Sequence, residues 1–122
     1  MNKYRRRELY KISARLENLA DAIAEMTAEE IHEKMKSLNE DIDYTQSEEQ
    51  DAYDYFPDNL KYSAKGEAME DAISDMGDAI YALDDALELI EGMNGAVASD
   101  ILEKLKEHLK RDSSYVEDSA SH

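Results

Sequence analysis

Residues 69–90 read MEDAISDMGDAIYALDDALELI, and an apolar side chain recurs among them every three or four positions. The members of this ladder are Met69, Ile73, Met76, Ile80, Leu83, Leu87 and Ile90. That spacing puts the apolar residues on one stripe of an α-helix, as in a helix that packs against another helix. The sequence therefore predicts a long helix that ends at the turn GMNG, residues 92–95.

A second apolar ladder precedes the first. It comprises Leu9, Ile12, Leu16, Leu19, Ile23 and Met26 and, after a five-residue step, Ile31, Met35, Leu38 and Ile42. The step falls where Thr27 and Glu30 have the spacing of a capping box. Two interpretations follow: a helix break at Thr27, or one continuous helix from Glu8 to Tyr53 with a local phase shift. The absence of Gly or Pro at the step favours the continuous helix.

The remaining segments complete an all-α fold. Pro57 ends the first helical segment, and a third, short helix with an apolar face runs from about Ala96 or Ser99 to Arg111. Residues 112–122 lack periodicity and are typical of a frayed end. We predict a long antiparallel, coiled-coil-like helical hairpin with a short third helix. These form one helical domain over residues 1–111, followed by a disordered, flexible C-terminal tail at 112–122.

The hairpin geometry predicts an uncovered apolar seam. A continuous first helix would be about 70 Å long, against about 42 Å for a return helix over residues 64–91. The seam left over consists of Leu9, Ile12, Leu16, Leu19 and Ile23. Because burying such residues is favourable by roughly 1.5–3 kcal/mol each, we expect this seam to form a homodimer.

Charge is unevenly distributed along the chain. The 122 residues carry a formal net charge of −16, from 30 acidic and 14 basic side chains. Residues 1–24 carry +3, whereas residues 25–60 carry −10 and residues 61–92 carry −7. This asymmetry is typical of a protein that meets a charged partner. No signal peptide or membrane-spanning run is evident, so we expect a cytoplasmic location and no membrane partner.

The sequence shows no catalytic or cofactor-binding constellation. Glu29 and His32 have the spacing of a di-iron motif, and residues 41–49 resemble half of a calcium loop, but neither pattern is completed. Without cysteine there is no thiolate ligand, and no nucleophile–base pair or glycine-rich phosphate loop stands out. We expect a non-enzymatic protein with no metal and no cofactor.

The predicted turn carries a family resemblance. Residues 48–60 read EEQDAYDYFPDNL and lead into SAKGEAMEDAI at residues 63–73. This stretch resembles small, uncharacterised acidic helical proteins of phages and prophages of Gram-positive bacteria, over about half of the chain. The present chain departs from them by an extra segment near residues 27–47 and by a longer C-terminal part. The resemblance implies a mobile-element origin, a helical hairpin and action inside a bacterial host cell, and it brings no activity with it.

The acidic helices predict a binding function. Residues 33–58 and residues 67–91 hold nine Asp or Glu each, and folded antiparallel they approach the charge density of duplex DNA. We therefore expect an inhibitor that binds a basic, nucleic-acid-handling host protein by mimicry, with a CRISPR effector nuclease as the leading candidate. The expected contact residues are Asp51, Tyr53, Asp54, Tyr55, Asp58, Asp71, Asp75 and Asp78. The alternative is a structural or oligomerisation module with no inhibitory role.

Two further features remain open between two interpretations. The tyrosines around the turn either cover the hairpin end as half-buried rings or form an interface hot spot. The basic cluster comprises Lys3, Arg5, Arg6, Arg7, Lys11 and Arg15. It either contacts phosphate or pairs with acidic residues of a neighbour. The net charge favours pairing, so we expect no direct contact with nucleic acid.

Overall fold

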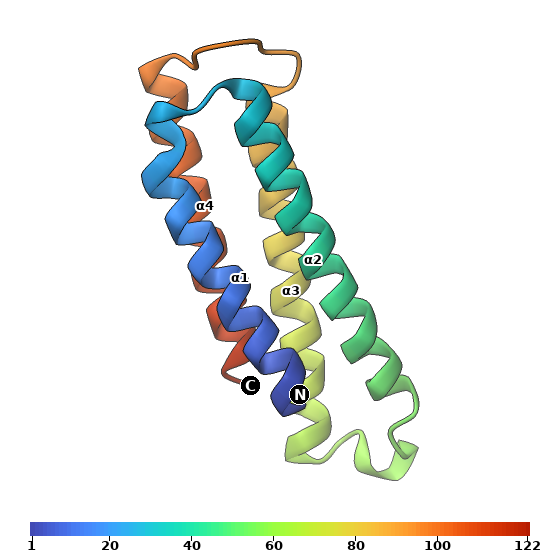
Figure 1. Ribbon diagram of the computed structural model, residues 1–122. Coiled ribbons are helices and arrows are strands. Elements are labelled where there is room, and N and C mark those ends of the chain that lie inside the picture. Colours follow the sequence, from blue (N-terminus) through green and yellow to red (C-terminus); the bar gives the residue numbers. More distant parts are fainter.

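The chain folds into a bundle of four α-helices. The computed structural model describes residues 1–122 and contains α1 (Lys3–Ala22), α2 (Ala28–Asp54), α3 (Ala64–Ile90) and α4 (Ser99–Ala120). The chain runs the length of the bundle four times in alternating directions, so each helix is antiparallel to the neighbours it packs against (Figure 1). The all-α prediction is confirmed. No helix combines the length and the apolar character needed to cross a membrane.

The prediction of a continuous first helix is wrong, because the chain reverses between α1 and α2. A 3₁₀ turn over Ile23–Glu25 ends α1, and Met26 is extended, with φ −113° and ψ 153°. Thr27 then caps α2 with a complete capping box, its Oγ1 accepting from the Glu30 amide at 3.2 Å. The capping box and the five-residue step in the apolar ladder thus mark a helix start.

The loop between α3 and α4 stabilises this reversal. The backbone amide of Ala28 donates to the carbonyl of Gly95 at 2.7 Å. In return, the Gly95 amide donates to Glu29 Oε1 at 2.7 Å. Gly92 and Gly95 adopt φ of 77° and 72°, which favours glycine. The beginning of α2 is therefore held by a loop that lies almost seventy residues later in the chain.

The predicted disordered tail is wrong as well, because α4 continues to Ala120. Its C-terminal half buries Asp112, Ser113, Val116, Ser119 and Ala120. Ser113 and Ser13 of α1 lie with their hydroxyl oxygens 2.8 Å apart, and Ser119 donates to the carbonyl of Ala72 at 2.7 Å. Small residues let α4 approach α1 and α3 closely, so this polar segment packs as a helix.

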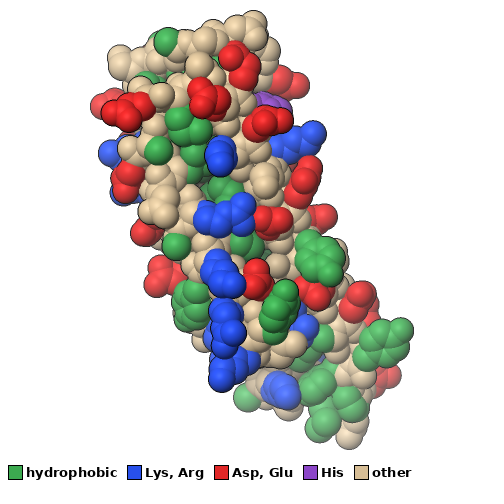
Figure 2. Space-filling view, viewed as in Figure 1, with side chains coloured by type: hydrophobic (Ala, Val, Ile, Leu, Met, Phe, Trp, Pro, Cys, Tyr) green, Lys and Arg blue, Asp and Glu red, His purple; other side chains and the backbone are tan.

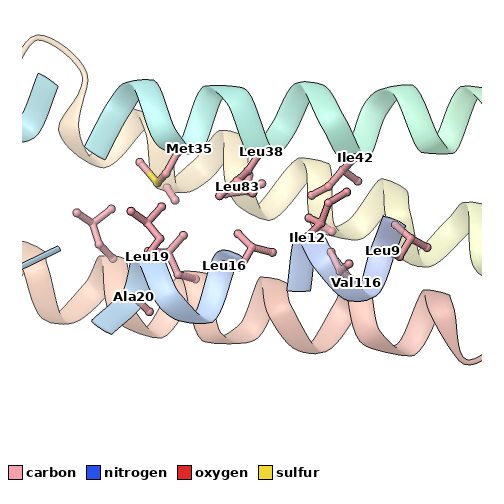
Figure 3. Close-up of a cluster of buried hydrophobic side chains, with 14 of the residues drawn as sticks. Leu9, Ile12, Leu16, Leu19, Ala20, Met35, Leu38, Ile42, Leu83 and Val116 are labelled. Atoms are coloured by element: carbon pink, nitrogen blue, oxygen red, sulfur yellow. The ribbon is translucent and has the colours of Figure 1, made fainter. Parts of the chain in front are cut away.

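The core fills the space between the four helices, and side chains from all of them meet there (Figure 3). All five residues of the predicted dimer seam are buried inside the single chain: Leu9, Ile12, Leu16, Leu19 and Ile23. The structure thereby corrects their assignment as an oligomer seam, because α4 is long enough to cover α1. The seam expected to drive a homodimer is therefore already buried within one chain.

A close backbone approach at the beginning of α3 yields a stability prediction. A Cβ built on Gly66 would lie 2.2 Å from the carbonyl oxygen of Lys61, a distance that forces the backbone to move. We expect Gly66→Ala to destabilise the fold by about 1–3 kcal/mol, in the range of overpacking substitutions. Urea unfolding followed by circular dichroism measures this difference.

Gly77→Ala is the matched control for that substitution, because both glycines lie in α3. Its Cβ would meet only the flexible Gln46 side chain, at 3.3 Å. Alanine has the higher helix propensity, by about 1 kcal/mol, so Gly77→Ala should leave stability unchanged or raise it. Equal losses in the two variants would contradict the role given to the Lys61 carbonyl.

Candidate acidic interface

The bundle segregates its charge onto two sides. On one side, α2 has ten acidic and two basic residues and α3 has eight acidic and one basic, a net charge of −15. On the other, α1 has six basic and three acidic residues and α4 has four basic and six acidic, a net charge of +1. Because α2 packs against α3 and α1 against α4, nearly all of the net negative charge lies on the α2/α3 side.

A groove of about 470 Å³ runs between α2 and α3 on this acidic side. From α2 it is lined by His32, Lys36, Asn39, Glu40 and Asp43. From α3 and its C-cap residue, Glu91, it is lined by Ile80, Asp84, Leu87, Glu88 and Glu91. Asn39 donates to Asp84 Oδ1 at 2.8 Å and so links the two walls. We refer to these ten residues as the acidic groove.

The acidic groove also contains two half-buried apolar side chains, Ile80 and Leu87, which pack against the bundle core. None of its five carboxylates lies within 4.0 Å of a cationic group; the ion pairs of the chain are elsewhere. The groove therefore combines an apolar contact area with uncompensated negative charge. Neither the carboxylates nor the apolar residues of this groove were among the predicted contact residues.

At the end of the bundle where α2 turns into α3, Tyr53 is used within the fold. Its hydroxyl donates to Glu70 Oε1, and Lys61 Nζ lies 5.0 Å from the centre of its ring. The hydrogen bond to Glu70, followed by burial, raises the pKa of Tyr53 to about 12. A ring held in this way covers the end of the bundle, so the structure favours a structural role for Tyr53 over that of a free anchor.

Other side chains at the same end of the bundle are exposed to solvent. Tyr55 and Tyr62 are 90% and 88% exposed, and Leu60 is 43% exposed. The predicted contact residues Asp51, Asp54 and Asp58 are exposed around them. Apolar side chains gather at this end of the molecule (Figure 2). We refer to Tyr55, Leu60 and Tyr62 with these three aspartates as the turn cluster.

The three predicted contact residues of α3 do not join the turn cluster. Asp71 and Asp75 line a separate hollow with Asp118 and His122 at the C-terminal end of α4. Asp75 Oδ2 lies 2.6 Å from His122 Nε2. Asp78 is exposed and lines neither this hollow nor the acidic groove. The predicted set is thus divided among three places on the surface.

The basic residues of α1 are partly used for internal contacts. Arg5 pairs with Glu49 at 3.0 Å and Arg15 with Asp41 at 2.7 Å, both partners belonging to α2. Arg6 donates to the carbonyls of Ala120 and His122. Lysine and arginine side chains form a column along α1, beside the acidic residues of α2 (Figure 2). Pairing with neighbouring acidic residues thus occurs within the chain.

The geometry gives no sign of a metal centre. No group of three or more histidine, aspartate or glutamate side chains is arranged to hold a metal ion. Glu29, half of the di-iron pattern, instead accepts the Gly95 amide, while His32 lies in the acidic groove. Comparison with protein-family models, with curated proteins and with solved structures found no match.

Proposed function

We propose that this chain is an acidic binding protein of a phage or mobile element. In this proposal it occupies the nucleic-acid-binding surface of a basic host protein and performs no chemistry itself. The observation that carries the proposal is the net charge of −15 on α2 and α3, against +1 on α1 and α4. A charge difference of this kind between two sides of a small bundle steers and orients a basic partner.

The charge density supports mimicry of a nucleic acid. Helices of 27 residues, such as α2 and α3, extend for roughly 40 Å at 1.5 Å per residue. Fifteen net charges over that length give about one per 2.7 Å, compared with one per 1.7 Å of duplex DNA. A basic channel that accepts DNA through its phosphates would therefore meet a comparable density of negative charge on this side.

The turn cluster provides a direct test of the proposal. Replacing Asp51, Asp54 and Asp58 together with asparagine should slow association with the basic partner about tenfold, since exposed charges act chiefly on the association rate. These charges are exposed, so the variant should remain folded. The partner is first isolated from host lysate by pull-down, with a CRISPR effector nuclease tested directly. Association rates are then measured at two salt concentrations, together with displacement of labelled nucleic acid.

The control for the turn-cluster variant removes the same number of charges from the opposite side of the bundle. Glu103, Glu107 and Glu117 are exposed on α4, and their joint replacement by glutamine should leave the association rate nearly unchanged. If the wild-type protein binds the partner without displacing nucleic acid, mimicry is refuted. Equal slowing by the two triple variants would show that net charge alone matters and that the turn cluster is not the interface.

A further inference from the structure

The acidic groove has the dimensions and chemistry of a site for one helix. We propose that it binds a basic amphipathic α-helix of the partner, so that the complex contains a fifth helix lying along α2 and α3. This inference rests on the proposed function, which it deepens by naming the element of the partner that is recognised.

The length of the groove corresponds to three helical turns. Its lining spans eleven residue steps on each wall, from His32 to Asp43 on α2 and from Ile80 to Glu91 on α3. At 1.5 Å per residue this is about 16 Å. The two walls belong to helices that pack against each other in opposite directions, so the lining residues of α2 lie alongside those of α3.

The apolar residues of the groove match the repeat of a helix. Ile80 and Leu87 are seven positions apart on α3, which places them on the same face about two turns apart. An approaching helix with apolar residues at i, i+3 or i+4, and i+7 can contact both. Because these two side chains are half-buried and already rest on the core, they offer a fixed surface rather than a flexible one.

The charges of the acidic groove favour a positively charged helix as its occupant. Glu40 and Asp43 line one wall, and Asp84, Glu88 and Glu91 line the other; none has a cationic partner. Lys36 is the one lysine or arginine among the lining residues. A helix that carries lysine or arginine on both sides of its apolar stripe would place cations beside both walls. A neutral or acidic helix would leave the repulsion between the walls in place.

The test uses two synthetic peptides of about 15 residues, the length at which an isolated helix begins to be stable. One has leucines at i, i+3, i+4 and i+7 with lysines flanking the stripe; the other has the same composition in scrambled order. Fluorescence anisotropy measures the affinity of each for the full chain. We expect the amphipathic peptide to bind about tenfold more tightly, because only its order lets the leucines reach Ile80 and Leu87 together.

Charge variants locate the binding site. Replacing Glu40, Glu88 and Glu91 with glutamine should weaken binding of the amphipathic peptide about tenfold. Replacing Glu103, Glu107 and Glu117 of α4 with glutamine makes the same change in net charge. This control should weaken binding of the amphipathic peptide less than threefold. All six glutamates are exposed, and circular dichroism verifies that each variant is folded. Equal affinity of the two peptides, or equal loss in the two variants, would overturn the helix site.

These outcomes are separable from a failure of the proposed function. If nucleic acid is displaced from the basic partner but the peptides bind equally, the helix site is wrong and mimicry stands. If the amphipathic peptide binds selectively but no nucleic acid is displaced, mimicry is wrong and the groove remains a helix site. Failure of both peptides to bind would overturn the helix site without affecting the displacement result.

Discussion

Replacing Asp112 with asparagine is expected to abolish most of a pH dependence in the stability of this bundle. Asp112 is fully buried on α4, and neither carboxyl oxygen has a hydrogen-bond partner. Burial raises the pKa of Asp112 from its ordinary value of 3.8 to about 8; Asp85 adds to the rise and Arg111 opposes it. One turn earlier on α4, His108 also has an unpartnered buried atom, Nδ1.

The sign of the effect follows from the direction of this pKa shift. Because the folded state holds the proton more tightly than the unfolded state, the stabilisation is fully present below pH 4 and is lost as the pH rises through 8. Between these pH values the free energy of unfolding of the wild type should fall, relative to that of Asp112→Asn, by up to about 1.4 kcal/mol per pH unit. Urea unfolding of both proteins at pH 5, 6.5 and 8 measures the difference. These pH values run from above the ordinary pKa of the carboxyl up to its raised pKa.

A control on the same helix separates Asp112 from the general acidity of the chain. Glu107 is exposed, so Glu107→Gln should follow the wild-type pH profile within about 0.5 kcal/mol. A wild-type profile parallel to that of Asp112→Asn would show that the carboxyl is not protonated on folding. That result would contradict the effect assigned to burial.

The apolar ladders predicted the helices well wherever the buried side chains are apolar. The ladder from Met69 to Ile90 lies within α3. The step in the other ladder marks the helix break at Thr27, although the absence of Gly or Pro there favoured a continuous helix. A capping box and a 3₁₀ turn are enough to reverse the chain when a distant loop supports them. That support involves Gly95, whose position beside α2 depends on the tertiary fold.

The C-terminal half of α4 was missed because polar residues occupy its buried positions. Leu105, Leu109, Asp112, Val116 and Ser119 continue a 4-3-4-3 spacing, but Asp112 interrupts its apolar residues after Leu109 and Ser119 interrupts them again. Ser113 is buried against Ser13 of α1, and its contacts are with a residue one hundred positions away in the sequence. A helical periodicity that includes small polar residues as well as apolar ones would have indicated that α4 continues to its C-terminal half.

The candidate site was predicted as a region rather than as residues. Composition located the excess charge on the segments that became α2 and α3, whereas the expected contact residues lie around the turn and along the return helix, outside the acidic groove. The carboxylates of the acidic groove recur at helical spacing on each wall, Asp84, Glu88 and Glu91 on α3 for example. Placing them opposite Glu40 and Asp43 required the register of the two helices, which the sequence did not define.

A buried ion pair should produce the second large effect. Glu49 of α2 is fully buried, with Arg5 Nε and Nη2 each 3.0 Å from Oε1 and the α-ammonium of Met1 3.4 Å from Oε2. Removing one member of such a pair leaves an uncompensated buried charge and costs about 3–5 kcal/mol. We expect Glu49→Met to lower the free energy of unfolding by that amount, as measured by urea denaturation.

The exposed pair between Arg15 and Asp41, also joining α1 to α2, is the matched control. Its two side chains are 49% and 47% exposed at a separation of 2.7 Å. Solvent screening limits such a pair to about 0.2–1 kcal/mol, so Arg15→Met should change stability little. Comparable losses in Arg15→Met and Glu49→Met would show that burial does not distinguish the two pairs.

A double-mutant cycle tells whether the buried pair stabilises the fold or only fixes its geometry. Arg5→Met and Glu49→Met should each be destabilising, because each leaves a buried partner charge. In the double variant the two charges disappear together, and apolar side chains of similar length replace them, so most of the loss should be recovered. The Met1 ammonium still lacks its carboxylate there, which sets a limit to the recovery. Additive losses would instead mean that Arg5 and Glu49 stabilise the bundle through separate contacts.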